Sequence, residues 1–200
     1  MMRPTREQSM GWLDWADQKN PGPWRKHAET AARAAQRIAE ATEMDAELAW
    51  HMGLLHDIGR YEGVTAFRHV IAGYRFILGE GFPEIARICL THSFPYGNVR
   101  TEYCGEFDVP DEDIVLAEKA LVDANDYDKL IQLCDAISMP EGVCLMEKRL
   151  VNVSMRYGFR QNTLEKWRAT MQIMEMFNER AGFSIYKLFP EAAAVTFGYA

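Results

Sequence analysis

The run Leu54-Leu55-His56-Asp57-Ile58-Gly59-Arg60 ends an apolar segment with a histidine–aspartate pair. The apolar spacing that precedes the pair predicts a helix over residues 45–58, with Gly59 just after its end. Adjacent helical residues diverge by about 100°, so His56 and Asp57 cannot both hold one ion in a narrow bite. They can flank a metal site at the helix end, where the carboxylate oxygens could reach a second ion.

The helical period recurs along the rest of the chain, whereas alternating strand patterns are scarce. We therefore predict an all-α protein, a compact bundle of eight or nine helices. The longest predicted irregular loop covers residues 93–110, and its part from 97 to 110 could be either a lid or an ordinary connection. With 200 residues and 48% hydrophobic content, the chain is expected to form a single domain over residues 1–200. The predicted helices cover residues 5–18, 24–42, 45–58, 67–80, 83–92, 111–124, 126–138, 141–157 and 161–181.

Charge and composition restrict the classes of partner. The net charge of −7 repels nucleic-acid backbones and anionic lipids, so we expect no polymeric nucleic acid and no membrane as partners. A small anionic substrate stays open, because a metal ion can override the global field locally. Lacking a signal-peptide pattern or a long apolar run, the protein is expected to be cytoplasmic. The eleven methionines and an aromatic-rich tail could pack a core or a homo-oligomer interface.

The four cysteines include no CxxC pair, which argues against a zinc ribbon or a thioredoxin-type motif. Cys89 and Cys134 fall in apolar helical runs, where a free thiol behaves as a small core residue. We therefore expect reduced, structural thiols.

Three histidines fall on helix faces that should be apolar. His27 projects within about 60° of the centre of an apolar stripe, and His69 and His92 share the helical spacing of apolar neighbours. A single inward histidine is usually a hydrogen-bonded core residue, and His51, about 140° around its helix from His56, is best explained in this way. However, four of the five histidines lie inward or beside an aspartate, which favours metal binding.

Asp135 lies in residues 130–137, a stretch that is apolar nearly all round and is therefore predicted to be buried. A buried, ionised carboxylate costs several kcal/mol unless it is paired or bound to a metal. No lysine or arginine lies one turn away on the same helix. A cation from elsewhere is therefore required.

In this order, His27, His56–Asp57 and Asp135 resemble the HD superfamily of metal-dependent phosphohydrolases, and the context LLHDIGR is typical of that family. Many two-metal members carry two further histidines, which His69 and His92 resemble. The resemblance covers residues 24–138 and implies an HD-type helical fold. The helices predicted over residues 141–200 match nothing assignable and are expected to pack on this core.

The resemblance implies one or two divalent metal ions. We expect Asp57 to bridge two ions, with His27, His56 and Asp135 on one and His69 and His92 on the other. If His69 is not a ligand, a one-metal site of His27, His56, Asp57 and Asp135 remains. An imidazole-rich shell favours iron, manganese, cobalt, nickel or zinc, although magnesium stays open.

The implied reaction is hydrolysis of a phosphomonoester or phosphodiester bond in a small molecule, plausibly a nucleotide, by metal-activated hydroxide. Arg60 and Lys129 are expected to bind the phosphate, because similar positions in the family are often basic. The first alternative is a mixed-valence di-iron oxygenase of the same fold. Two others are a signalling module with a vestigial site and a helical domain that metals merely stabilise.

Overall fold

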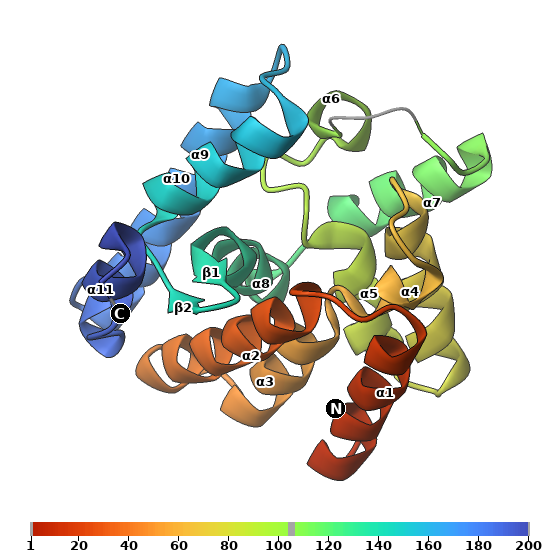
Figure 1. Ribbon diagram of the computed structural model, residues 1–200, viewed down its shortest axis with the longest axis horizontal. Helices are drawn as coiled ribbons and strands as arrows, with labels where there is room; N and C mark the ends of the chain where they lie inside the picture. Colours follow the sequence, from red (N-terminus) through yellow and green to blue (C-terminus); the bar gives the residue numbers. More distant parts are fainter. Residues whose placement is uncertain (1, 104–106, 200) are drawn as a thin grey trace.

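Helix α8 (Asp126–Ile137) lies at the centre of the molecule (Figure 1). The computed structural model describes residues 2–103 and 107–199. The helices α2 and α3 pack closely against each other, and α4 packs on α5. The prediction of an all-α protein is confirmed. The helices that pack most extensively against α8 are α2 (Trp24–Ala41), α3 (Ala46–Leu55), α5 (Pro83–Thr91), α9 (Met146–Tyr157) and α10 (Thr163–Ala181).

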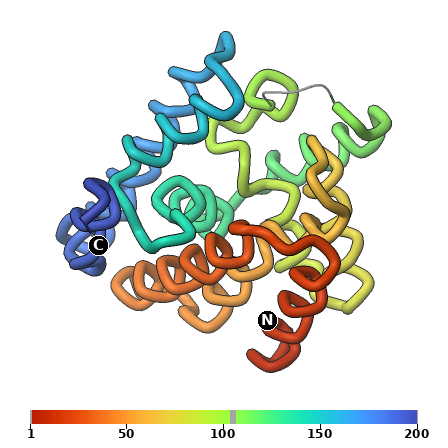
Figure 2. Tube along the Cα trace, viewed as in Figure 1, coloured from red at the N-terminus to blue at the C-terminus, as the bar shows by residue number. Residues whose placement is uncertain are grey.

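The remaining elements surround this centre. Helices α9 and α10 run in opposite directions on one side of α8, and α4 and α5 lie on the other side (Figure 2). None of the helices in the described residues combines the length and the apolar character needed to cross a membrane. The other elements are α1 (Arg6–Lys19), η1 (Ile58–Glu62), α4 (Arg68–Gly79), α6 (Val99–Glu102), α7 (Asp111–Val122), β1 (Ser138–Met139), β2 (Gly142–Val143), η2 (Ile185–Leu188) and α11 (Ala192–Phe197).

Local capping explains where several helices begin. Thr5 and Gln8 form a reciprocal capping box at α1, and Asn125 and Asp128 form another at α8. The Asp45 carboxylate accepts a hydrogen bond from the third residue of α3. Each cap satisfies amide groups that have no partner within the helix.

Two clusters of buried apolar side chains hold the helices together. The larger extends from α1 through α2, α3, α5 and α8 to the C-terminal elements. Cys89 and Cys134 belong to it as buried free thiols, as predicted, and Cys144 is also buried and free. The fourth cysteine, Cys104, lies outside the described residues. The smaller cluster is formed by Phe67, Val70, Ile71, Leu90, Phe94, Val99, Ile114 and Ala117.

Several predicted boundaries were wrong. Helix α3 ends at Leu55 and gives way to the 3-10 turn η1, so the doublet lies beyond the helix rather than within it. Helix α9 begins at Met146 instead of residue 141, because the two-stranded hairpin β1–β2 occupies residues 138–143. The short helix α6 forms inside the loop predicted over residues 93–110.

Gly59 brings η1 into direct contact with α4. A Cβ atom on Gly59 would overlap the carbonyl oxygen of His69 and the amide nitrogen of Gly73. Only glycine fits at this crossing. The turn after the doublet is therefore held against the helix that carries His69.

Candidate metal centre

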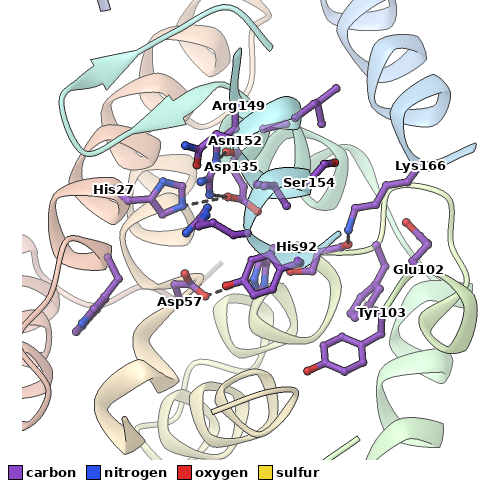
Figure 3. Close-up of a pocket in the computed structure, with 18 of the residues that line it drawn as sticks. His27, Asp57, His92, Glu102, Tyr103, Asp135, Arg149, Asn152, Ser154 and Lys166 are labelled. Atoms are coloured by element: carbon purple, nitrogen blue, oxygen red, sulfur yellow. Dashed lines mark hydrogen bonds and ion pairs between the residues drawn. The ribbon is translucent and has the colours of Figure 1, made fainter. Parts of the chain in front are cut away.

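The structure brings the six predicted ligands close to one another, and five of them, all except His56, line a cavity of about 800 Å³. Figure 3 labels His27, Asp57, His92 and Asp135 in this cavity. His27 comes from α2, His69 from the first turn of α4 and Asp135 from α8. His56 and His92 occupy the C-caps of α3 and α5. The sixth residue, Asp57, starts the turn η1.

His27, His56 and Asp135 form the first group. Their ligand atoms all lie within 4.8 Å of one another, and His27 Nε2 is 3.0 Å from Asp135 Oδ1. Two atoms that each lie about 2.1 Å from one ion are roughly 3 Å or a little more apart. The spacing between His27 and Asp135 therefore fits two ligands of a single ion.

Asp57 faces both sides of the centre. Its Oδ1 atom is 3.4 Å from His69 Nε2 and 3.6 Å from His92 Nε2. Its Oδ2 atom is 3.9 Å from His56 Nε2. This carboxylate is thus placed between the first group and the pair His69 and His92, as a bridging ligand would be.

The four histidines share one hydrogen-bonding pattern. In each of them Nδ1 contacts a backbone carbonyl oxygen, which can only accept, so Nδ1 must carry the proton. The Nε2 atom is then unprotonated and directs its lone pair at the centre, the usual arrangement for a metal-binding imidazole. The contacts are His27 with Ser138 (3.1 Å), His56 with Gly53 (2.7 Å), His69 with Ala66 (2.6 Å) and His92 with Cys89 (3.0 Å).

Three buried atoms of the centre lack a hydrogen-bond partner within the described chain: Nε2 of His27, Nε2 of His56 and Oδ1 of Asp57. Leaving such an atom unsatisfied costs about 1–3 kcal/mol. All three are electron-pair donors, so a protein donor or a divalent cation would satisfy them. Imidazole nitrogens mixed with carboxylates are the donor set that transition metals prefer. The residues therefore fit a metal centre.

The ionisation states also suit a cation. Burial lowers the pKa of His56 to about 4 and that of His69 to about 3, so both imidazoles are neutral at pH 7. Burial raises the pKa of the Asp57 carboxyl, but the charge of Arg60 outweighs burial and holds that pKa well below its usual range. Metal binding needs neutral imidazoles and ionised carboxylates.

Arg60 lies on the cavity wall beside the centre. Its Nε atom donates to Asp57 Oδ2 at 2.6 Å, and its Nη2 atom lies 3.4 Å from His69 Nε2. By contrast, Lys129 is half-buried on α8 and is not among the described residues that line the cavity. Of the two predicted phosphate-binding residues, the structure brings only Arg60 to the centre.

Asp135 differs from the prediction in its surroundings. Its side chain is 24% exposed rather than fully buried, because α8 presents it to the cavity. Arg149 of α9 supplies a positive charge from another element, as Asp135 requires. Its Nη2 atom lies 3.1 Å from Asp135 Oδ1, and its Nε atom donates to the Asp135 carbonyl at 3.3 Å. Burial raises the pKa of Asp135, but the adjacent charge of Arg149 helps to hold it well below its usual range. Figure 3 shows Arg149 beside Asp135.

His51 lies away from the centre. Its Nδ1 atom is 2.8 Å from the hydroxyl of the buried Ser9, and Nε2 lies 3.6 Å from Glu47. The core assignment made from the sequence therefore agrees with its contacts.

Comparison with known families agrees with this geometry. The family model of the HD domain matches residues 25–139, which is more than half of the chain. The protein therefore belongs to the HD-domain family, a family made up largely of metal-dependent hydrolases. No curated protein and no solved structure matches the chain.

Proposed function

We propose that the protein is a metal-dependent phosphohydrolase that cleaves a phosphomonoester or phosphodiester bond of a small molecule. The observation that carries this proposal is the convergence of partnerless Nε2 and carboxylate atoms from helices far apart in the sequence. Desolvated acceptors of this kind are costly in the absence of a cation.

His27, His56 and Asp135 would hold one ion, His69 and His92 would hold the other, and Asp57 would reach both. Bound divalent ions supply water activation near neutral pH and stabilise negative charge on a phosphoryl group. Iron, manganese, cobalt, nickel or zinc suits this ligand set best.

Arg60 has two tasks in this proposal. By donating to Asp57 Oδ2 it fixes the carboxylate, so that Oδ1 stays directed toward His69 and His92. Its guanidinium also adds positive charge on the cavity wall, where a phosphate oxygen would bind. A volume of about 800 Å³ is in the range of pockets that hold nucleotide-sized ligands.

The test is phosphate release from a panel of phosphorylated small molecules by protein reloaded with each metal in turn. The variant Asp57→Asn keeps the shape of the side chain but removes its charge. It should lower metal-supported phosphate release by more than about 100-fold, since this ligand lies closer to the ions than the outer residues whose loss costs 10–100-fold. Metal content per chain, measured by mass spectrometry, should fall as well.

The matched control is His51→Asn, another substitution of a buried polar residue, which should leave both metal content and turnover unchanged. Unaltered phosphate release by Asp57→Asn would refute the catalytic role of the centre. Oxygen consumption by the iron-loaded protein without phosphate release would favour the oxygenase alternative instead.

A further inference from the structure

One face of helix α9, polar except for Val153, lines the cavity. Arg149, Asn152, Val153 and Arg156 follow the spacing i, i+3, i+4 and i+7, which aligns them on one side of a helix. All four line the cavity. The family match ends at residue 139, so this face belongs to a part of the chain that the HD model does not describe.

Arg149 ties this face to the metal centre. Its two contacts with Asp135 hold the guanidinium at the cavity wall, and its side chain is only 14% exposed. Arg60 holds the matching position on the other carboxylate, Asp57. Each acid of the centre is therefore accompanied by one arginine.

Arg156 lies two helical turns after Arg149 and has no such acid. Among the described residues no carboxylate forms an ion pair with it, and its contact is with the Tyr157 ring, 5.4 Å from the guanidinium carbon. Arg156 is an exposed residue; desolvation and the charges of Arg149 and Arg60 lower its pKa, while Tyr157 and Asp135 raise it. Three guanidinium groups thus line the same cavity, and in the described part of the chain only Arg60 and Arg149 form ion pairs with a carboxylate.

We propose, on the basis of the phosphohydrolase function above, that Arg60, Arg149 and Arg156 together bind the phosphoryl group and select a dianionic phosphomonoester over a monoanionic phosphodiester. A guanidinium fork pairs with two phosphate oxygens at once. Near pH 7 a monoester carries close to two negative charges, whereas a diester carries one. Arg156, which forms no ion pair with a carboxylate of the described residues, therefore favours the ligand with the greater charge.

Binding of two small probes tests the proposal by affinity rather than by turnover. Calorimetry would compare methyl phosphate, a dianion at mildly alkaline pH, with dimethyl phosphate, a monoanion, on the metal-loaded protein. The native protein should bind methyl phosphate more tightly. Replacing Arg156 by glutamine should weaken methyl phosphate binding by about tenfold and leave the affinity for dimethyl phosphate nearly unaffected. The ratio of the two affinities should therefore fall.

Arg168→Gln provides the matched control, because it removes the same charge from a residue of α10 that is 73% exposed and does not line the cavity. It should bind both probes as the native protein does. Arg156→Lys restores the charge without the fork and should recover only part of the affinity. Thermal melts would verify that each variant is folded.

Equal binding of methyl phosphate by the native protein and Arg156→Gln would overturn the proposal, as would equal affinity of the native protein for the two probes. These results are separable from those of the proposed function. Arg156-dependent binding without phosphate release would refute hydrolysis alone. Phosphate release with an unchanged KM in Arg156→Gln would refute the arginine site alone.

Discussion

Gly59 shows how one residue can control the geometry of the centre. Because an added Cβ would meet the backbone of His69 and Gly73, Gly59→Ala must push η1 away from α4. We expect the free energy of unfolding to fall by about 1–3 kcal/mol or more, measured by urea titration. The same displacement moves His69, so metal content should also fall.

Gly79→Ala is the control for this substitution. Gly79 is the last residue of α4, and an added Cβ there would meet nothing within 4 Å. Alanine also has the higher helix propensity, by about 0.8–1.0 kcal/mol in a helix interior. Stability should therefore stay constant or rise slightly. Similar unfolding curves for both variants would show that the close approach of η1 to α4 is not needed.

At the scale of elements, a buried ion pair joins α5 to α8. Asp128 is fully buried, accepts a hydrogen bond from the Thr91 hydroxyl at 2.7 Å and pairs with Arg87 at 2.7 Å. The same carboxylate accepts from the Asn125 amide in the α8 capping box. Asp128→Ala leaves these partners unpaired. We expect a loss of about 3–5 kcal/mol in the free energy of unfolding, as for other broken buried pairs.

Asp126→Ala is the control for Asp128→Ala. It removes the same charge two residues away, but from an exposed side chain, so it separates the effect of burial from that of charge. Asp126 pairs with Arg180 at 3.0 Å, but its side chain is 54% exposed. Surface pairs contribute about 0–1 kcal/mol, so this variant should unfold almost as the native protein does. Chemical denaturation of the two variants side by side measures the difference, and equal losses would contradict the structural role of Asp128.

The sequence predicted elements well where the information is local. An apolar stripe indicates α2, α3 and α8 to within a few residues. The start of α9 could not be found in this way, since its first amides are satisfied from far along the chain. The Leu145 amide donates to the Thr196 hydroxyl at 2.8 Å, and the Met146 amide donates to the Tyr186 hydroxyl at 2.7 Å.

The site, too, could be predicted where its signal is local in the sequence and not where it depends on distant contacts. Inward histidines and a carboxylate in an apolar run are visible in sequence, and all six predicted ligands converge in the structure. Arg149 and Arg156 were missed, because a polar helix stripe normally indicates a solvated face. Their spacing of seven residues was the available signal. Lys129 was chosen from the family pattern, but it does not line the cavity.

The buried imidazoles make the free energy of unfolding of the protein depend on pH. The folded-state pKa values of His56, about 4, and His69, about 3, lie below the unfolded value of 6.5. Their contribution is therefore complete above pH 6.5 and is lost as the pH falls toward the folded values. Metal-free protein should show a falling midpoint of urea unfolding between about pH 7 and about pH 5.

A variant tests the origin of this slope. His56→Asn removes one of the two groups, so the midpoint should depend less steeply on pH over the same interval. If the native slope is flat, or if the variant keeps the native slope, proton uptake by His56 does not limit the stability of the metal-free protein.

Three of the four converging histidines take their orientation from the main chain three residues earlier: His56 from Gly53, His69 from Ala66 and His92 from Cys89. Every residue has a carbonyl, so no mutation of a neighbouring side chain deletes these acceptors. During evolutionary divergence the surrounding surface can therefore change without altering which imidazole nitrogen is presented. Substrate preference, which would depend on side chains of α9, can therefore change in related proteins. The tautomers of these histidines stay the same as long as the helix backbones are kept.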